Sequence, residues 1–337
     1  MKEMKILSPL DSIEEVDKLA KAGAGEFFCG VLEDSWYEKY PVISINRRPA
    51  GKGHFRRFED LKEAVTRAHG LGIPVYFTVN EHYYTQAQYD LIRWYLEEAV
   101  GSGIDAFIIT DFGLLQFIKE QGYPAAIHIS TGGTVFNWRS AAFFKELGAG
   151  NITFPRHLSI AEIGDITAKM PPMETTVFVL NSRCINIDGF CTFQHGLARK
   201  EVLPMFRNAC MLPFEVQVCS RDGGLPFMRQ ACMIERQRIG ERVHVDDHPC
   251  GACALFEFLK LGIGSLKVVG RGNPLERKVH DVQFLKRLLE MLDVKPSRTE
   301  FRQTARKLYH ETYNRQCRSH MCYYPEVLLD GAGGDEA

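Results

Sequence analysis

The sequence predicts an α/β protein built as a (β/α)8 TIM-like barrel, with a cysteine-rich insertion after strand 7 and a C-terminal helical tail. Two observations favour this fold. Eight short runs of β-branched or aromatic residues alternate with amphipathic segments, which is the pattern of parallel strands joined by crossover helices. The alternation fills residues 1–275, a normal length for one such barrel. An open, doubly wound sheet would show the same alternation and is the alternative.

The predicted strands follow one another in this order: 5–9, 26–30, 74–80, 106–111, 126–130, 152–155, 176–180 and 265–269. The segments between them have the apolar spacing of helices: 12–22, 58–70, 86–100, 113–121, 138–147, 160–170 and 252–261. Helix signals agree, since Ser159 and Glu162 form a capping box and Gly23, Gly122 and Gly148 follow helix ends. We expect residues 276–337 to be a separate helical extension, with helices at 279–292 and 299–315.

Composition narrows the class of protein. The chain has 41 Lys and Arg against 42 Asp and Glu, so no overall positive field draws it onto nucleic acid or an anionic bilayer. No apolar stretch is long enough to span a membrane, and acidic residues interrupt the N-terminus before a signal-peptide core could form. We therefore expect a cytoplasmic protein without membrane insertion. Its ten cysteines then indicate metal or redox chemistry rather than structural disulfides.

The insertion 181–249 holds half of the cysteines and is far longer than an ordinary connection of about 2–6 residues. They are Cys184, Cys191, Cys210, Cys219 and Cys232. Because the insertion follows a barrel strand, it must leave at the C-terminal face, where barrel enzymes build their active sites. We therefore expect the cysteines to lie at the active site.

Four thiolates can hold either zinc or an iron–sulfur cluster. Six residues separate Cys184 from Cys191 and the next cysteines are isolated, which favours a cluster over the short knuckles of zinc sites. Cys250 and Cys253 make one knuckle-like pair, so zinc remains the alternative. Near the C-terminus, Cys317, His320 and Cys322 are further potential ligands, but we expect no metal there.

Polar side chains at the predicted strand ends are candidates for chemistry. Three candidate catalytic residues end strands, namely Asn80, Asp111 and His128, although each could merely cap a helix or bond a neighbouring loop. Four arginines near the same face are candidates for binding an anionic substrate, because guanidinium recognises carboxylates bidentately. They are Arg47, Arg48, Arg156 and Arg271. The alternative for the arginines is solvated surface.

Several motifs occur in a specific order. INRR stands at 45–48, TVN at 78–80, HIST at 128–131, FVLNSRCINIDGFC at 178–191 and SLKVVGR at 265–271. In this order and spacing the chain resembles peptidase family U32 over nearly its whole length. Within that family it is most similar to the UbiU-like iron–sulfur subgroup of anaerobic ubiquinone biosynthesis.

The resemblance implies a [4Fe–4S] cluster held by Cys184, Cys191 and Cys210, with Cys232 as the fourth ligand and Cys250 as its alternative. It further implies hydroxylation of an aromatic or heteroaromatic acceptor without dioxygen. That acceptor would be a quinone precursor or an RNA base, and prephenate is the implied oxygen donor. It also implies a homologous U32 protein as a heterodimer partner.

The chain departs from the family pattern at three positions. Leu180 replaces a histidine four residues before Cys184, Val269 replaces the carboxylate of a KIEGR motif, and Gly132 replaces a glutamine. A hydrolase that used these polar groups as acid or base would be impaired. Two alternatives to the hydroxylase remain open, a collagenase-like peptidase and a non-catalytic RNA-binding or assembly protein.

Overall fold

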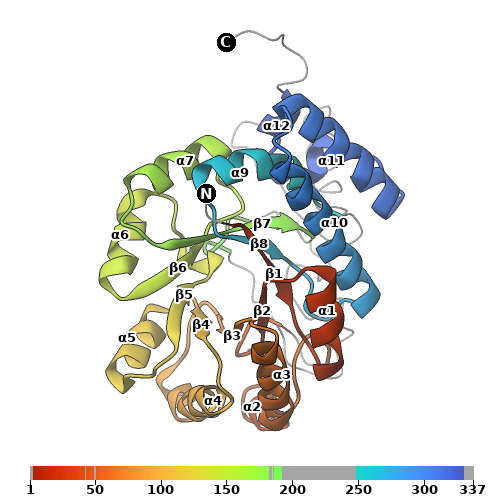
Figure 1. Cartoon of the computed structure of the whole chain (residues 1–337). Coiled ribbons are helices and arrows are strands. Elements are labelled where there is room, and N and C mark those ends of the chain that lie inside the picture. Colours follow the sequence, from red (N-terminus) through yellow and green to blue (C-terminus); the bar gives the residue numbers. More distant parts are fainter. Residues whose placement is uncertain are drawn as a thin grey trace, which may run out of the picture.

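The strands of this chain close into a parallel barrel. The computed structural model describes residues 3–41, 43–48, 51–181, 184, 186–191 and 248–329. Within these residues the strands pair in the order β1 to β8, and β8 returns to β1 (Figure 1). Their bounds are β1 Lys5–Pro9, β2 Glu26–Cys29, β3 Val75–Val79, β4 Ala106–Ile109, β5 Ala126–Ile129, β6 Ala149–Thr153, β7 Glu174–Leu180 and β8 Ser265–Val268. The predicted barrel is confirmed, and the open sheet is excluded.

Helices cover the outside of the barrel (Figure 1). They are α1 Val16–Ala22, α3 Phe58–Gly70, α4 Tyr89–Gly101, α5 Phe112–Gln121, α6 Trp138–Glu146, α7 Ile160–Lys169 and α9 Leu255–Leu261. The predicted capping box starts α7, because the Ser159 hydroxyl accepts a bond from the Glu162 amide and the Glu162 carboxylate accepts one from the Ser159 amide. The further helix α2, Asp34–Lys39, lies in the β2–α3 connection and was not predicted. Its Trp36 is fully buried and donates to the Ile43 carbonyl over 2.8 Å.

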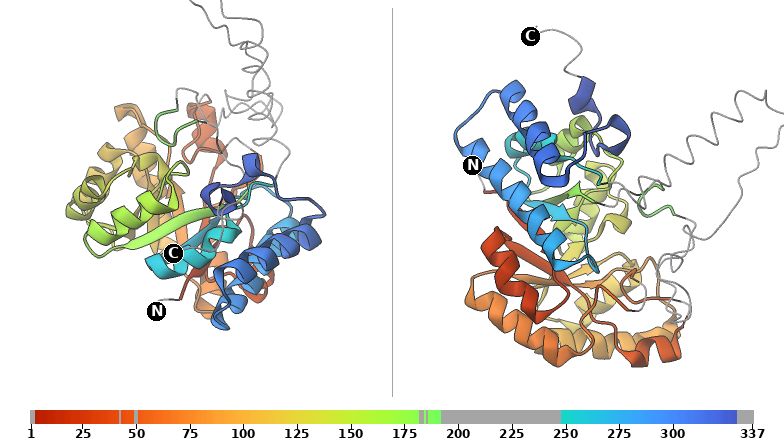
Figure 2. Two further views of the ribbon diagram at one scale, coloured as in Figure 1. Left: turned by 90° about the horizontal axis from the view of Figure 1, so that it is seen from above. Right: turned by 90° about the vertical axis from the view of Figure 1, so that its right-hand side faces the viewer.

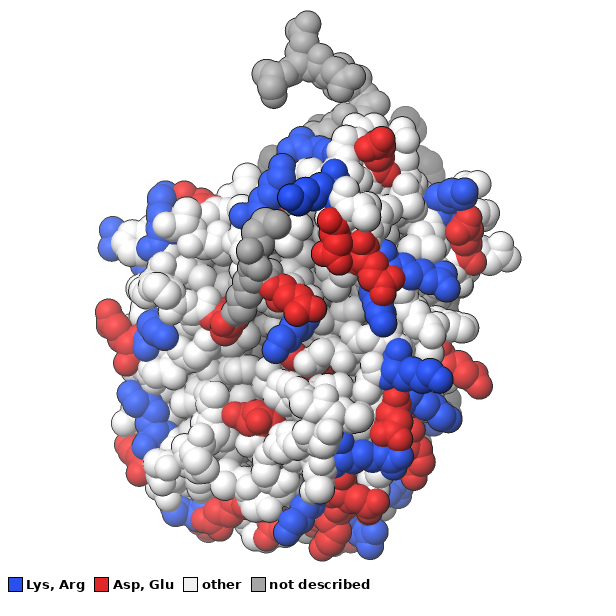
Figure 3. Space-filling view, in the orientation of Figure 1, with Lys and Arg blue, Asp and Glu red and all other residues white. Residues whose placement is uncertain are grey.

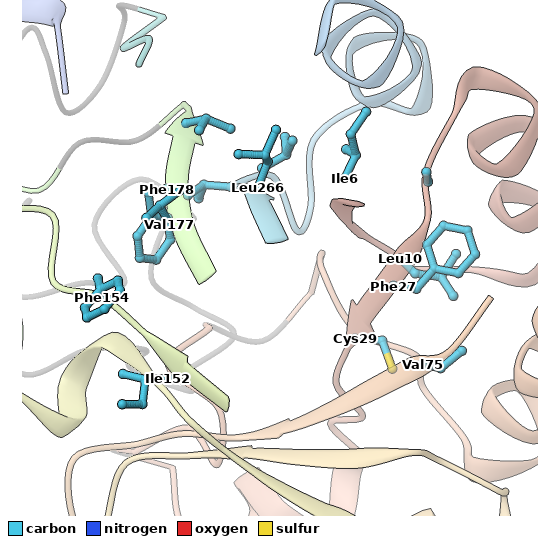
Figure 4. Close-up of a cluster of buried hydrophobic side chains, with 14 of the residues drawn as sticks. Ile6, Leu10, Phe27, Cys29, Val75, Ile152, Phe154, Val177, Phe178 and Leu266 are labelled. Atoms are coloured by element: carbon cyan, nitrogen blue, oxygen red, sulfur yellow. The ribbon is translucent and has the colours of Figure 1, made fainter. Parts of the chain in front are cut away.

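Side chains alternate between two cores along each strand. Outward residues such as Phe27, Cys29 and Val75 pack against the helices (Figure 4). The inward residues Leu7, Phe28, Tyr76, Ala106 and Ile108 form a separate, smaller cluster inside the barrel. Cys29 is therefore a buried core thiol, and burial raises its pKa well above the ordinary value.

The C-terminal helices gather on one side of the barrel (Figure 2). These are α10 Leu275–Asp293, α11 Arg298–Tyr313 and α12 Glu326–Leu329. The buried Lys278 of α10 donates to Glu15 over 2.8 Å and also pairs with Asp11, both near the start of α1. The division of the chain at residue 275 into barrel and extension stays a prediction.

Positive and negative side chains are interspersed over the face seen in Figure 3, as the near-zero net charge predicts. No helix in the described ranges is long and apolar enough to cross a membrane.

Candidate active site at the barrel mouth

The interior of this barrel carries polar side chains beside its small apolar cluster, where TIM barrels usually hold mostly branched apolar side chains. In β8, Ser265 and Lys267 alternate with Leu266 and Val268, which belong to the outer core. The Ser265 hydroxyl donates to Glu26 over 2.6 Å, and the Tyr76 hydroxyl donates to the same carboxylate over 3.0 Å. A polar layer of this kind is unnecessary for packing, which makes the interior a candidate for binding or chemistry.

Lys267 is a buried cation in this interior. Its side chain is 5% exposed, and its Nζ lies 4.5 Å from the ring centroid of Phe28 and 5.7 Å from that of Phe178. Burial lowers the pKa of Lys267 to about 7, assisted by the positive charges of the four predicted arginines, Arg271 first. The positive charges of these four arginines thus act on one buried group, and their role in binding an anion stays a prediction.

Arg271, just beyond β8, is held in place by β3 and by the connection between β2 and α3. Its guanidinium donates to the Thr78 hydroxyl over 2.8 Å and to the Asn46 carbonyl over 2.7 Å, and it is 8% exposed. Gly30 makes room for it, because a Cβ on Gly30 would lie 2.8 Å from the Arg271 guanidinium nitrogen. Burial and the neighbouring Arg48 lower the pKa of Arg271 to about 9.

Arg156 holds the cysteine loop onto the barrel mouth. Its Nε lies 3.5 Å from Asp188 Oδ2, and its amide donates to the same oxygen over 2.9 Å. The Thr131 hydroxyl also donates to Asp188, over 2.8 Å. Burial raises the pKa of Asp188, but Arg156 and these hydrogen bonds outweigh burial and leave that pKa below its ordinary value. Asp188 is thus a charged anchor between Cys184 and Cys191, a role that the sequence did not indicate.

Two of the predicted cluster ligands are described, and two are not. Cys184 and Cys191 are half-buried in the loop that follows β7. Cys210 and Cys232 lie outside the described residues, so their predicted role stays a prediction. Within the described residues no group of three or more His, Cys, Asp or Glu side chains has the geometry to hold a metal ion.

Cys250 lies beside the strand from which this loop leaves. Its backbone forms an isolated antiparallel β-bridge with Leu180, the last residue of β7, and an isolated parallel β-bridge with Cys322, and no disulfide joins the two cysteines. Burial raises the pKa of Cys250, and the neighbouring thiols of Cys253, Cys322 and Cys317 raise it further. The C-terminal cysteines therefore lie near the barrel mouth, a proximity that the sequence did not predict.

The three predicted catalytic residues have different surroundings. The His128 ring packs edge-on against Tyr76 at 4.5 Å inside the barrel, and burial lowers its pKa to about 4. Asn80 Nδ2 donates to the Ser130 hydroxyl over 3.3 Å. Asp111 accepts from the Leu114 amide over 2.7 Å and so caps α5, which was the structural alternative for this residue. Catalytic roles for the three stay a prediction.

Sequence reasoning missed Lys267, although a signal existed. A lysine inside the run SLKVV stands in a strand that is otherwise buried on both faces, and a charged residue there needs an explanation. It also missed Glu81, which is 3% exposed and whose pKa burial raises to about 7 although Arg47 opposes the shift. No motif marks Glu81.

Comparison with known proteins places the chain in a family. The sequence model of peptidase family U32 matches residues 11–328. The "tRNA hydroxylation protein P" of Escherichia coli is 25% identical across 92% of this chain and 73% of its own length. The protein of the same name from Helicobacter pylori is 27% identical across 72% of this chain and 54% of its own length. The "Collagenase" of Porphyromonas gingivalis is 23% identical across 56% of this chain and 44% of its own length, so the chain spans about half of each of the latter two proteins. This chain, matched over almost all its residues, belongs to peptidase family U32.

Proposed function

We propose that this protein hydroxylates a base of tRNA without dioxygen, using a [4Fe–4S] cluster and a carboxylate-bearing oxygen donor such as prephenate. The observation that carries the proposal is the Arg156–Asp188 contact, because it fixes the cysteine loop directly over the cationic barrel mouth. Relatives named as tRNA hydroxylation proteins support tRNA as the acceptor, in preference to a quinone precursor.

The donor set fits a cluster better than zinc. The ligands would be Cys184, Cys191 and Cys210, with a fourth thiolate from Cys232 or Cys250. The bridge between Leu180 and Cys250 favours Cys250, since it holds this cysteine beside the strand end from which the Cys184 loop departs. When bound, such a cluster supplies electron transfer or a site that polarises an oxygen atom.

The residues of the chain would bind and orient the donor. The arginines and Lys267 attract its carboxylates, and the rings of Phe28 and Phe178 exclude water around Lys267. His128 is neutral at neutral pH and can therefore accept or donate one hydrogen bond inside the barrel. The flipped base would enter from the open C-terminal face.

A peptidase is the weaker proposal for this chain. Leu180 and Val269, which replace the family's histidine and carboxylate, are neighbours, because the Val269 amide donates to the Leu180 carbonyl over 3.1 Å. Both are buried, at 1% and 7% exposure. Two neighbouring apolar residues at the ends of β7 and β8 thus replace the histidine and the carboxylate that a hydrolase could use as base and acid.

Iron analysis tests the cluster. After anaerobic purification, the protein is expected to show the visible absorption typical of iron–sulfur proteins and to contain about four iron atoms per chain. Substitution of Cys184, Cys191 or Cys210 by Ser should remove most of the iron, whereas Cys317→Ser, at an exposed cysteine, should not. Comparing Cys232→Ser with Cys250→Ser identifies the fourth ligand. A colourless protein that contains zinc would refute the cluster.

Nucleoside analysis tests the reaction. A deletion strain should lose one hydroxylated tRNA nucleoside, and the wild-type gene should restore it while the Cys184→Ser gene should not. If the nucleosides are unchanged and a quinone precursor accumulates instead, the acceptor assignment is wrong. Copurification from the same strain would reveal the homologous U32 partner that the resemblance implies.

A further inference from the structure

We propose that Arg277 of α10 is a positioning residue, because it ties together the two ends of the insertion 181–249 and thereby holds Cys184 near Cys250. The inference rests on the proposed function, in which these two cysteines supply ligands to one cluster. It can be tested on the metal-free chain, without iron and without turnover.

Arg277 contacts both ends of the insertion. Its Nη2 donates to the side-chain oxygen of Asn181 over 2.9 Å, and the same nitrogen lies 3.2 Å from Nδ1 of His248. Asn181 is the first residue after β7, and His248 comes two residues before Cys250. One guanidinium group therefore joins two positions that are far apart in the chain.

Asn181 is fixed by further hydrogen bonds. Its amide donates to the Pro249 carbonyl over 2.8 Å. Its Nδ2 donates to the Val269 carbonyl over 2.9 Å and to Asp281 Oδ2 over 2.7 Å. Its φ is +64°, a left-handed conformation that asparagine adopts more readily than most residues. The chain therefore leaves β7 in one defined direction, beside the end of the insertion.

Helices α10 and α11 hold the partners of these contacts. Asp281 of α10 is fully buried, and it also accepts a bond from the Tyr313 hydroxyl over 2.8 Å. The Tyr309 hydroxyl donates to the His248 carbonyl over 2.7 Å, and the His248 ring centroid lies 5.1 Å from that of Tyr313. Because α10 and α11 pack against each other, one rigid surface holds both ends of the insertion.

This buried network fixes a geometry that stability alone does not require. Burying the charge of Asp281 costs more than burying an apolar side chain, whereas a hydrogen-bonded network specifies one arrangement of its members. Cys184 follows Asn181 by three residues, which span at most about 11 Å, and the backbone of Cys250 pairs with Leu180. The contacts of Arg277 thus keep both cysteines at the end of β7.

Iron analysis tests the role of Arg277. Arg277→Met should lower the iron content of the anaerobically purified protein at least fivefold, whereas Arg277→Lys, which keeps the charge but not the planar guanidinium, should retain part of the iron. Asn181→Gly keeps the left-handed backbone and removes the side chain, so it should repeat the loss. Arg287→Met, at an exposed arginine of the same helix, is the control and should leave the iron unchanged.

Thiol cross-linking tests the position of the cysteines without metal. Dibromobimane joins neighbouring thiols, so it should link Cys184 to Cys250 in the metal-free wild type, as peptide mass spectrometry would detect. Arg277→Met should lower the yield of this link at least fivefold at a temperature where circular dichroism shows a folded chain. This control separates displaced cysteines from a misfolded protein.

Wild-type iron and cross-linking in Arg277→Met would overturn the proposal. So would the absence of the link in the wild type, or a loss in Arg277→Met that Asn181→Gly does not repeat. A wild type that binds no iron but whose link depends on Arg277 would support the positioning role while refuting the proposed cluster.

Discussion

At the scale of single residues, the barrel mouth concentrates charge that folding alone does not explain. Arg156 and Arg271 were predicted from their places near strand ends, and Arg47 and Arg48 from the loop after the second strand, because guanidinium groups can bind an anion at that face. Lys267 was missed because alternation along a strand predicts which residues are buried. It does not show that a charged residue among them has a function. The distinction matters, since Lys267 is the group whose pKa all four arginines lower.

The pH dependence of stability should reveal Lys267. Its pKa falls from 10.5 to about 7 on folding, so between these values the unfolded chain binds a proton that the native state does not. Stability should therefore rise with pH across this window, by at most roughly 1.4 kcal/mol per unit, and the cost of charging Lys267 is fully present below about pH 7. Lys267→Met removes that cost.

Urea unfolding at pH 6.5 and 9.5 measures the effect in a buffer without polyvalent anions. The variant should exceed the wild type in unfolding free energy at pH 6.5, and the gap should narrow at pH 9.5. His128 remains in both proteins, but the charge of Lys267 helps to lower its pKa, so the variant shifts the His128 titration as well. If the difference in unfolding free energy between the two proteins is the same at pH 6.5 and 9.5, Lys267 keeps its ordinary pKa.

At the scale of elements, the sequence was most informative where burial is continuous. Strands such as β3 are buried along their whole length, and their apolar runs predicted them closely. The sixth strand was predicted at 152–155 but spans Ala149–Thr153, because Ala149, Gly150 and Asn151 carry no β-branched signal. Asn151 instead accepts a bond from the Thr176 hydroxyl over 3.0 Å, a contact that only the folded barrel creates.

The cysteine loop depends on one close approach to the turn after β5. Gly189 has φ of +85°, and a Cβ there would lie 2.1 Å from Thr134 Cγ2 and 2.7 Å from the Gly132 carbonyl oxygen. Gly189→Ala should therefore displace the loop and remove most of the iron. Gly122→Ala is the matched control, since Gly122 has φ of +65° but open space around it and lies at the end of α5.

Gly122→Ala should lower the unfolding free energy by about 1 kcal/mol through backbone strain, and Gly189→Ala should lower it by more, because its Cβ also overlaps Thr134 and Gly132. Only Gly189→Ala should lower the iron content, measured per protein after anaerobic purification. Full iron in Gly189→Ala would mean that the contact with Gly132 does not position the cluster ligands.

At the scale of the whole molecule, distant parts of the chain meet at the rim of β7. The Tyr324 hydroxyl donates to the Phe178 carbonyl over 3.0 Å, and the Tyr323 hydroxyl donates to the Asn181 carbonyl. The backbone of Cys250 pairs with both Cys322 and Leu180 through isolated β-bridges. Such contacts could not be predicted from sequence, because nothing local to residues 321–324 specifies a partner more than a hundred residues earlier.

Removal of this C-terminal segment should therefore disturb the active site as well as the fold. A chain that ends at Asn314 loses Tyr323 and Tyr324, which are both 2% exposed, and removes the backbone pairing of Cys250 with Cys322. Burying two aromatic side chains is worth several kcal/mol, so we expect a clear drop in melting temperature. The end of β7 would also lose its cover, and with it the support of the loop that carries Cys184.

The decisive measurement compares this truncation with Tyr324→Phe, which removes one hydroxyl and keeps the ring. Tyr324→Phe should cost about 1 kcal/mol and retain iron and prephenate binding, whereas the truncated chain should lose iron even below its melting temperature. A truncated chain with full iron content would separate the segment from the active site. The predicted extension beyond residue 275 would then stabilise the barrel without supporting the active site. Loss of iron would instead show that the end of the extension supports the cysteine loop.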